Sequence, residues 1–448
     1  MKAYSKYKDS EIEWVKQIPS AWEICKLKYT ALGKGQCFID GDWIESKDIS
    51  TDGIRYLTSG NVGPLKYKEQ GNGYITEDTF RKLECKDVYE GDILISRLNE
   101  PISRACIVPN LNSRIVTCVD NVIYRPDCNR FNKKYIVYVL NCTPYTEKAN
   151  LSARGVTMHR VSRTMLGNFY IPVPSIAEQQ AIASFLDAKT KPIDDIIAKR
   201  ERQVELLEEM KSAIISRAVT KGLNPEAKMK DSGIEWIGEI PEGWEISKVK
   251  YIARVCGRIG YRGYTTNDLV PAGEGALTIG GKHITHNYLN ISDPDYISWE
   301  KYYESPEIML EKGDIVMAQR GSLGKSALID REIGEATINP SLVILKRIKA
   351  NGVFLHYSLI SNMMQDYINL INTATAVPMI SQNQIENTPI ALPPLSEQQA
   401  IASYLDSETS KIDSRIAKRR KQIELLQEYK QALITAAVTG KIDVRDYI

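Results

Sequence analysis

The sequence has 448 residues, a formal net charge of +2, a hydrophobic fraction of 43% and a charged fraction of 25%. These values are ordinary for globular proteins, so they exclude a chain that is mainly disordered. No apolar run approaches the ~18–20 residues that span a bilayer, the polar N-terminus lacks a signal peptide, and the near-zero charge argues against non-specific coating of acidic polymers.

In chain order, the first recognisable feature is a tryptophan motif that occurs twice. Residues 9–24 contain Asp-Ser-Glu-Ile-Glu-Trp, then Ile-Pro, then Trp-Glu-Ile, and residues 231–246 repeat this pattern 222 positions later with Gly233 in the third place. The sequence Gly-Asp-Ile at residues 91–93 recurs at residues 313–315 with the same shift. This repetition indicates two copies of one structural unit.

Each copy continues with a divergent stretch of about 150 residues. Residues 91–96 and 313–318 each combine a glycine turn with a short apolar strand, whereas the apolar runs at 136–140 and 341–345 fit either a strand or a helix. Gly, Asn and Asp are frequent in both stretches, and each stretch ends in prolines. The excess of 24 Tyr over 6 Phe fits either wet interfaces, such as those with nucleic acid, or a partly exposed β-rich fold. The pattern predicts two β-rich modules.

The second repeated block is nearly identical in the two copies and is predicted to be helical. About 27 of 43 positions agree between Glu178–Thr220 and Glu397–Thr439. Each block begins with Glu-Gln-Gln and ends with Ala-Val-Thr. Apolar residues recur at three- and four-residue steps along residues 193–218 and at the equivalent positions of the second copy. This period predicts two helices of about 28 residues, or ~42 Å, that pack antiparallel with one module at each end.

Single residues suggest where these helices begin and how wide their apolar face is. Pro192 is expected in the first turn, where its missing N–H costs little, and Ser410 begins a sequence that resembles a capping box. Leu206 and Met210, with Leu425 in the second copy, are expected to widen the buried stripe. The predicted helices then present one broad apolar face to each other.

The sequence lacks the motifs of the catalytic classes considered. The nearest string to the Asn/Asp-Pro-Pro-aromatic signature of adenine methyltransferases is Asn339–Leu342, which lacks the second proline and the aromatic residue. Gln319 stands where a phosphate-binding loop needs its first glycine, and no G-x-S-x-G nucleophile elbow occurs. His283 and His286 form a pair without a carboxylate cluster, which is weak evidence for a metal site. The sequence therefore indicates a non-catalytic binding or scaffold protein.

The cysteine pattern bears on the compartment. The chain has 8 Cys, none of them in a C-x-x-C pair. This spacing fits neither a zinc site nor a disulfide framework. We expect reduced thiols and a cytoplasmic protein.

Together, the repeated features resemble the specificity subunit of a type I restriction–modification system. The resemblance covers essentially the whole chain and rests on the tryptophan motif, the Gly-Asp-Ile turn, the proline-rich junction into Glu-Gln-Gln and the terminal Ala-Val-Thr, each present twice. It implies an α+β fold with two mixed α/β, β-rich target recognition domains joined by two long antiparallel coiled-coil helices in a pseudo-twofold internal repeat. One departure lies in the first copy, where residues 156–161 replace the more familiar Val-Pro-Met-Ile-Ser-Gln of residues 377–382.

The resemblance also implies how the chain is divided. Each recognition domain would read one half of a split, asymmetric DNA sequence, and the helices would fix the number of unread base pairs between the halves. A rod of ~42 Å is of the right magnitude for half-sites one DNA turn, or ~34–36 Å, apart.

The parts of the chain that the resemblance implies are an N-terminal segment (1–21), target recognition domain 1 (22–174), conserved helical region 1 (175–222), a linker with the start of the second repeat (223–243), target recognition domain 2 (244–394) and conserved helical region 2 (395–448).

The resemblance implies that this chain is not itself an enzyme and holds no cofactor. Two modification subunits would bind the helical region and carry S-adenosylmethionine and adenine methylation. Two restriction subunits would add translocation and cleavage driven by ATP and Mg. Two alternatives remain open: a complex that only methylates, and a protein-binding scaffold that does not contact DNA.

Candidate DNA-contacting residues are polar and basic side chains expected on loops, because such side chains read base edges and phosphates. Arg97 and Arg320 are the strongest candidates, since both closely follow the Gly-Asp-Ile strand. The candidates are Ser59, Asn61, Lys66, Arg97, Asn99, Arg104 and Arg154 in the first copy, and Lys282, His283, Gln319, Arg320, Ser322 and Lys325 in the second. The partner-binding candidates on the helices are Arg200, Leu207, Lys211, Arg419, Leu426 and Lys430.

Overall fold

The computed structural model describes residues 2–33, 37–155, 159–258, 263–372 and 377–447. The chain divides into two compact units, which are Met1–Glu201 with Lys421–Ile448 (unit 1) and Arg202–Arg420 (unit 2). Each unit therefore combines one β-rich module with parts of both long helices. Among the described residues, no helix has the length and the apolar run that a membrane crossing needs.

Module 1 is built on two small sheets. A four-stranded antiparallel sheet has the order β4–β10–β7–β8, and a three-stranded sheet has the order β6–β5–β9, with β5 and β9 parallel. Strand β7 is buried on both faces, because Ile93 and Ile95 enter one hydrophobic cluster and Leu94 enters another. The elements are β1 (Tyr7–Asp9), β2 (Gln17–Pro19), β3 (Glu23–Lys26), β4 (Phe38–Asp40), β5 (Ile54–Leu57), β6 (Tyr74–Ile75), α1 (Glu77–Lys82), β7 (Ile93–Ser96), β8 (Ala105–Ile107), β9 (Ile115–Thr117), β10 (Asn121–Tyr124), α2 (Lys133–Leu140), α3 (Thr143–Leu151), α4 (Arg163–Asn168) and β11 (Tyr170–Val173).

Module 2 repeats this plan with longer strands. One four-stranded sheet has the order β15–β24–β21–β22, and a second has the order β16–β20–β17–β23, with β17 and β23 parallel. The elements are β12 (Met229–Asp231), β13 (Glu239–Pro241), β14 (Glu245–Lys248), α6 (Val249–Ile252), β15 (Arg254–Gly257), β16 (Leu269–Val270), β17 (Gly275–Ile279), β18 (Ile284–Thr285), β19 (Tyr288–Leu289), β20 (Asp295–Ser298), α7 (Trp299–Tyr303), β21 (Ile315–Ala318), β22 (Ser326–Leu328), β23 (Ala336–Ile338), β24 (Leu342–Lys346), α8 (Gly352–Ile360), α9 (Asn362–Leu370), α10 (Gln382–Glu386) and β25 (Pro389–Leu392).

The two apolar runs that the sequence left open have different structures. Residues 136–140 lie in helix α2, whose first turn is capped by Asn132, because the Asn132 side chain accepts a hydrogen bond from the backbone N–H of Tyr135 at 3.0 Å. Strand β24 contains residues 342–345 of the second run, and it pairs with β21 on one side and β15 on the other. The flanking residues and the pairing partners, not the apolar run itself, decide the structure.

The Gly-Asp-Ile turn has the same structure in both copies, and the predicted strand follows it in each. Gly91 and Gly313 have φ angles of 81° and 95°, which favour glycine. Asp92 and Asp314 each accept a hydrogen bond from a backbone N–H three residues earlier, both at 2.9 Å. The repeated sequence therefore encodes one turn that starts β7 in module 1 and β21 in module 2.

The two long helices are longer than the sequence predicted. Helix α5 is Ile176–Lys221, with 46 residues, and α11 is Leu395–Val438, with 44 residues. At 1.5 Å per residue, their lengths are about 69 and 66 Å rather than ~42 Å. Pro192 lies inside α5 and not in its first turn, and Ser410 lies inside α11, so the predicted capping box is wrong. The predicted length matched half-sites ~34–36 Å apart, and the observed helices are about twice as long as that separation.

The additional helical turns form because they are packed against a module. Ile182, Phe185 and Leu186 of α5 are buried in the core of module 1. Ile401 and Leu405 of α11 are buried in the same way in unit 2. A proline inside a helix costs about 3 kcal/mol, and burial of this apolar face offsets that cost. Tertiary packing therefore extends the helix beyond the start that the proline suggested.

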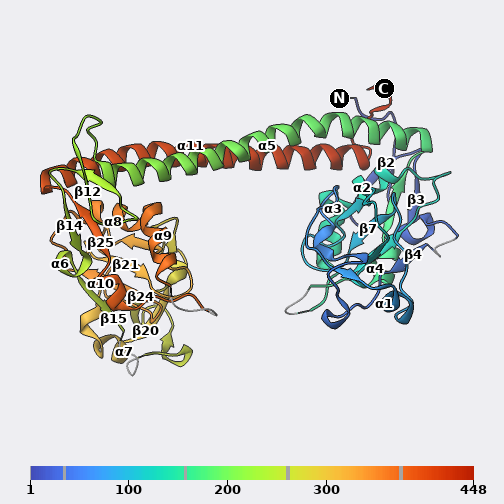
Figure 1. The fold of residues 1–448 in the computed structure, drawn as a ribbon. Coiled ribbons are helices and arrows are strands. Elements are labelled where there is room, and N and C mark those ends of the chain that lie inside the picture. The colour runs from blue at the N-terminus through green and yellow to red at the C-terminus, as the bar shows by residue number, and fades with distance from the viewer. Residues whose placement is uncertain (1, 34–36, 156–158, 259–262, 373–376, 448) are drawn as a thin grey trace. The chain divides into compact units, whose positions relative to one another are not determined.

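Helices α5 and α11 pack antiparallel in both units, as predicted (Figure 1). In unit 2, Lys211 Nζ lies 2.7 Å from Asp413 Oδ2, and in unit 1, Lys430 Nζ lies 2.5 Å from Asp194 Oδ1. These are equivalent positions, because 219 residues separate the two lysines and also the two aspartates. The pseudo-twofold repeat therefore extends to individual side-chain contacts.

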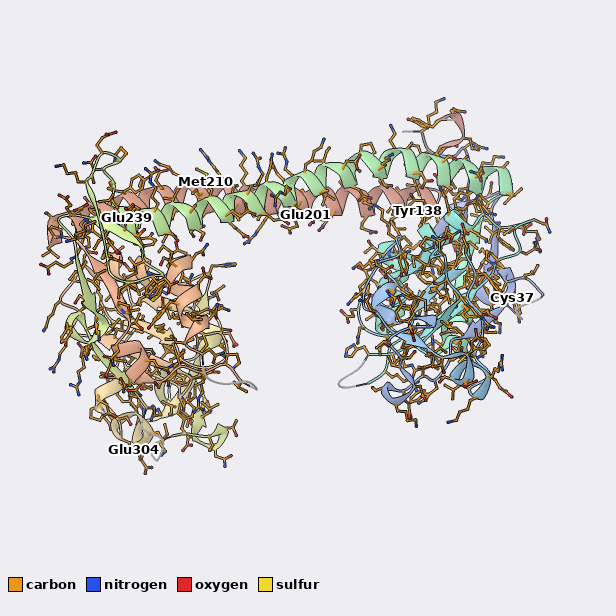
Figure 2. All side chains as sticks on the ribbon, in the orientation of Figure 1. Cys37, Tyr138, Glu201, Met210, Glu239 and Glu304 are labelled. Atoms are coloured by element: carbon orange, nitrogen blue, oxygen red, sulfur yellow. The ribbon has the colours of Figure 1, made fainter. Side chains whose placement is uncertain are left out.

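The buried stripe between the helices is narrower than predicted. Leu206, Met210 and Leu425 are 48%, 49% and 51% exposed, and Figure 2 shows Met210 at the surface of the helix pair. Tyr429, which is equivalent to Met210, is 55% exposed. Two helices in contact bury only a narrow seam on each, so residues beside the seam face outward. The helices therefore carry two exposed apolar pairs at equivalent positions, Leu206 with Met210 and Leu425 with Tyr429.

The repeated Glu-Gln-Gln segments attach each helix to its own module. Gln179 Oε1 accepts a hydrogen bond from the backbone N–H of Asn132 at 2.8 Å, and Gln398 makes the same bond with Asn351 at 2.8 Å. Both glutamines also donate to a proline carbonyl of the junction, at 2.9 and 2.8 Å. The second glutamine of each motif accepts from the same asparagine side chain. The near identity of these two segments is thus explained by the equivalent hydrogen bonds that each makes within the chain.

The tryptophan motif of each copy packs against the end of a long helix. Trp22 and Trp244 are both 1% exposed. Gly440, with φ 72°, follows α11 and lies so close to Pro19 that an added Cβ would be 2.3 Å from its Cδ. Gly222, with φ 71°, follows α5, and a Cβ there would lie 3.3 Å from Trp244. The first copy of the motif therefore packs against the end of α11 in unit 1, and the second copy packs against the end of α5 in unit 2.

Candidate nucleic-acid interface

The loop after the Gly-Asp-Ile strand forms a paired edge in both modules. The module-1 edge consists of residues 97–104 paired with 159–161, and the module-2 edge consists of residues 319–325 paired with 378–380. Backbone hydrogen bonds run from Asn99 to His159 (3.1 Å) and from Val161 to Arg97 (3.1 Å) in module 1, and from Gly321 to Pro378 (2.9 Å) and from Ile380 to Gln319 (3.0 Å) in module 2.

These bonds join equivalent positions of the two copies, so both edges share one backbone arrangement. Their side chains differ, because asparagine and histidine in module 1 stand where module 2 has glycine and proline. The hydrogen bonds align residues 159 and 161 with residues 378 and 380, so the sequence alignment of 156–161 with 377–382 was out of register by two residues, and residues 156–158 lie outside the described part of the chain. The fold thus presents different side chains on one repeated scaffold.

Arg97, one of the two strongest sequence candidates, is buried beneath the module-1 edge. The residue is 5% exposed, and its Nη2 lies 3.0 Å from Asp40 Oδ1. The guanidinium also donates to the carbonyls of Val119 and Val161. Burial lowers the pKa of Arg97, and the Asp40 carboxylate counteracts this shift. A guanidinium engaged in this way holds the module together, so we do not retain Arg97 as a base-contacting residue.

Arg104 holds the backbone of the module-1 edge in place through hydrogen bonds. Its guanidinium donates to the carbonyls of Val62 at 2.7 Å, Asn99 at 2.8 Å and Ser59 at 3.0 Å. A guanidinium has five N–H donors in a fixed plane, so one side chain can hold several turns together. Arg104 therefore sets the course of the loop that carries Asn99.

Asn61 and His283 are equivalent buried residues that each hold a tight turn. They are 0% and 1% exposed. Asn61 Oδ1 accepts a hydrogen bond from the backbone N–H of Thr58 at 2.9 Å, and His283 Nδ1 accepts one from Gly280 at 2.8 Å. Because Nδ1 accepts, Nε2 of the neutral imidazole donates to the Asp293 carbonyl at 2.9 Å. Both side chains serve the fold and are not retained as DNA contacts.

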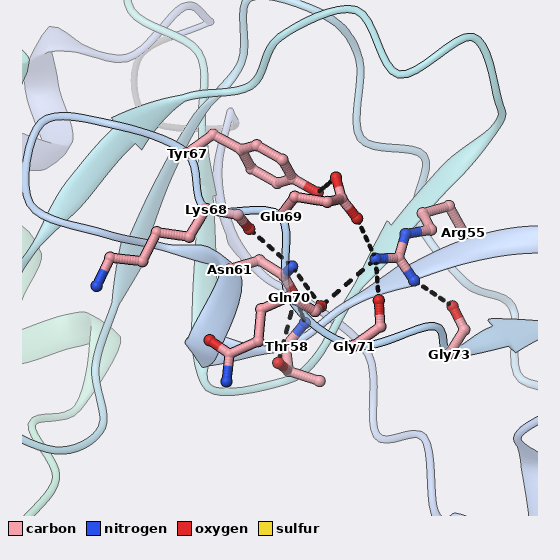
Figure 3. A network of polar contacts seen from close by, with 9 residues as sticks. All are labelled: Arg55, Thr58, Asn61, Tyr67, Lys68, Glu69, Gln70, Gly71 and Gly73. Carbon is pink, nitrogen blue, oxygen red and sulfur yellow. Dashed lines mark hydrogen bonds and ion pairs between the residues drawn. The ribbon is translucent and has the colours of Figure 1, made fainter. Parts of the chain in front are cut away.

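A buried arginine that the sequence analysis missed fixes the next part of the loop. Arg55 of strand β5 donates to Glu69 at 2.7 Å and to the carbonyls of Gly71 at 2.5 Å and Gly73 at 3.1 Å. Figure 3 shows how this network joins the one around Asn61, whose amide donates to backbone carbonyls of the same loop. No sequence signal distinguishes such an arginine from a surface one. The network makes residues 58–73 a fixed loop.

The other candidates are exposed or partly exposed. Lys66 pairs with Asp194 of α5 at 2.8 Å, and Lys282 pairs with Asp295 at 2.8 Å. Arg320 Nε lies 3.1 Å from the Met379 sulfur, and both residues belong to the module-2 edge. The exposed candidates are Lys66, Asn99, Arg154, Lys282, Arg320, Ser322 and Lys325, and the half-buried ones are Ser59 and Gln319.

Two polar residues of the module-1 edge, His159 and Arg160, were not predicted from the sequence. His159 is exposed, and Arg160 pairs with Asp120 at 2.9 Å while its side chain stays 39% exposed. Backbone hydrogen bonds at 3.0 Å join Arg154 and Arg160 in both directions. The structure therefore gathers Asn99, Arg154, His159 and Arg160 at one edge. Their nearness to the point where copy one departs from copy two was the signal that could have found them.

The partner-binding candidates lie along the seam of the helix pair. Lys211 and Lys430 are held by the interhelical ion pairs with Asp413 and Asp194. The others, Arg200, Leu207, Arg419 and Leu426, are half-buried. The exposed apolar pairs described above lie next to them and offer more free surface.

The described residues contain no group of three or more His, Cys, Asp or Glu arranged to hold a metal ion. His286 stands in the turn between β18 and β19, where it and Asn287 have φ angles of 51° and 64°. Positive φ at both central residues is typical of a two-residue hairpin turn. The spacing of His283 and His286 therefore reflects one buried residue and one turn residue.

Comparison with known proteins shows that both copies of the repeat match one protein family. The model of the type I restriction modification DNA specificity domain family matches residues 35–206 and 241–425, that is, both copies. The MjaX type I restriction enzyme specificity subunit of Methanocaldococcus jannaschii is 26% identical over 83% of this chain and 83% of its own. The MjaVIII specificity subunit of the same organism is 29% identical over 70% of this chain and 71% of its own.

A solved structure supports the fold. A chain from a study of complex assembly and conformational transition of the type I restriction–modification system superposes with a TM-score of 0.65 and 16% identity. The match covers 95% of this chain and 99% of the other. At this identity the likeness establishes the fold alone.

Proposed function

The chain belongs to the type I restriction–modification DNA specificity family, and on that basis we propose that it recognises a bipartite DNA target with one module for each half. The observation that carries the proposal is the duplicated edge, which presents different side chains on the same backbone. Two sites that read different sequences need the same presentation and different contacts. The chain is a recognition subunit, and catalysis belongs to the other subunits of the complex.

The proposed DNA contacts are exposed polar and basic side chains at or near the two edges. On module 1 they include Asn99, Arg154 and His159, and on module 2 they include Arg320 and Lys325. Arginine, lysine and asparagine on loops can contact base edges, and the cations can also contact phosphate. A net charge of +2 is small for a protein that grips DNA alone, so we expect the partner subunits to supply much of the phosphate contact.

The two exposed apolar pairs support docking of two copies of one partner on the helices. Leu206 with Met210, and Leu425 with Tyr429, are each four residues apart and therefore lie on one face of their helix. Leu, Met and Tyr side chains at such exposure favour a protein interface. We propose that the partners are two modification subunits carrying S-adenosylmethionine, completed by two restriction subunits that use ATP and Mg, and that the complex acts in the cytoplasm.

A footprint of the chain bound to a modification subunit tests DNA recognition directly. On a duplex that contains the target, we expect two protected patches that the modification subunit alone does not give. One continuous patch, or no sequence-specific protection, would contradict the proposal and favour a protein-binding scaffold. A complex that only methylates gives the same footprint, and the presence of a translocase-nuclease gene beside this one distinguishes it.

A further inference from the structure

A loop of each module reaches back to a long helix. In module 1, the turn closed by the bridge between Val62 and Tyr67 presents Lys66, whose Nζ lies 2.8 Å from Asp194 Oδ2. In module 2, the hairpin of β18 and β19 presents Tyr288, whose hydroxyl donates to Asp413 Oδ2 at 3.2 Å. The repeat shift places Lys66 and Tyr288 at equivalent positions. Two different side chains therefore make the same contact.

Each aspartate also binds a lysine of the opposite helix. Lys430 lies 2.5 Å from Asp194 Oδ1, and Lys211 lies 2.7 Å from Asp413 Oδ2. The two lysine side chains are only 15% and 18% exposed. Burial alone would raise the pKa of Asp194, but the hydrogen bonds from Lys430 and Lys66 together lower it. The carboxylate thus joins three elements, namely the module loop, its own helix and the opposite helix, and we call this three-way contact the brace.

The brace attaches each module further along its helix than the contacts described above. In module 1 the first attachment is the Glu-Gln-Gln segment at residues 178–180, the next is the bond from Tyr138 to Asp187, and Asp194 lies about 16 residues, or ~24 Å, beyond the first. In unit 2 a cavity of about 750 Å³ adjoins the brace, and its lining includes Tyr288, Tyr357 and Asp413. The Tyr357 hydroxyl donates to Asp406 at 2.9 Å beside this cavity, and Tyr288 makes the contact of the brace. Attachments spread over ~24 Å fix the angle of a module more firmly than attachments that lie close together.

We infer that Asp194 and Asp413 are positioning residues that fix the angle of each module on the helices, and thereby the separation of the two DNA halves that one complex reads. The inference rests on the proposed function and deepens it. Lys66, Lys211 and Lys430, which the sequence suggested for contacts with DNA or partners, act inside the chain. The brace needs an anion on the helix and a donor on the loop, and Lys and Tyr both meet that need.

The double variant K66A/Y288F removes the loop side of both braces and leaves both interhelical ion pairs in place. The full chain is co-purified with the modification subunit, and initial methylation rates are measured on duplexes whose spacer is native or one base pair longer or shorter. We expect the preference for the native spacer to fall about fivefold or more, since each contact of this kind contributes up to about a fivefold factor. The sequence preference within each half stays unchanged, and the single variant K66R, which keeps a cation opposite Asp194, retains the spacer preference of the native chain.

Lys68 provides the matched control, because it is exposed on the same loop as Lys66. K68A removes the same charge and should keep the full spacer preference. If K66A instead slows methylation equally at every spacer length and weakens its salt dependence, Lys66 is a phosphate contact and the inference is wrong. Full spacer preference in the double variant, with an unchanged unfolding midpoint, also overturns it. A wild-type complex that methylates no bipartite target would instead refute the proposed function.

Discussion

Replacing residues 22–172 with the corresponding module of another family member changes one half of the methylated DNA motif and leaves the other half unchanged. The exchange works because the boundaries keep two paired strands almost entirely within the exchanged segment. Strands β3 and β11 pair with each other, and both are replaced except for Val173, the last residue of β11, which stays with the host chain. The retained parts of the chain keep the helices and the whole of module 2. Methylome sequencing of cells that co-express the modification subunit reads both halves in one experiment.

The donor module must keep the contacts that attach it to α5. Asn132 has to remain asparagine, because Gln179 and Gln180 bind its backbone and side chain. Tyr138, which donates to Asp187 at 2.8 Å, is the second requirement. The reciprocal exchange of residues 244–391 is the control and should alter only the other half. A change in both halves, or in neither, would show that the modules do not read independently.

The variant R97A is expected to lose about 1–3 kcal/mol of unfolding free energy in unit 1, as removal of a buried donor that leaves its acceptors unsatisfied does. Asp40 would keep Arg163, whose Nε lies 2.9 Å away, but the two carbonyls that Arg97 serves would lose a donor. Urea unfolding of the purified chain measures the change.

The variant R154A is the matched control for R97A, because Arg154 is exposed at the same edge. It should change the unfolding free energy by less than about 0.5 kcal/mol. With the modification subunit present, R154A should weaken methylation of the target. An R97A chain that folds with native stability but no longer selects its target would contradict the structural role and return Arg97 to the set of base contacts.

The contrast between Arg97 and Arg320 explains why the fold was easier to predict than the contacts. Both arginines closely follow the same turn, but the repeat shift pairs Arg97 with Gln319, so Arg320 stands one position further along. Successive side chains of an extended segment point to opposite faces, so one residue separates a buried side chain from an exposed one. The repeated turn predicted the strand in each module. Whether a given side chain after that strand is buried or exposed depends on its exact position in the extended segment, and the turn alone does not give this.

The long helices were also predicted in part, since their presence followed from the sequence and their starts did not. Their existence, antiparallel packing and equivalence followed from the repeated apolar period, because that period is a property of the chain itself. Their starts did not, since Pro192 suggested a boundary and packing of Phe185 and Leu186 against the module carried the helix through it. The brace was also invisible in the sequence, because Lys66 and Asp194 are far apart in the chain and only the fold brings them together.

The central claim is that this chain reads two separate DNA segments, and the methylome of the native protein tests it most directly. The full chain is expressed with its modification subunit in cells that lack other adenine methylation, and methylated adenines are mapped across the genome. We expect one motif with two specified segments separated by a fixed number of unspecified base pairs. A single continuous motif, or methylation without sequence preference, would contradict it.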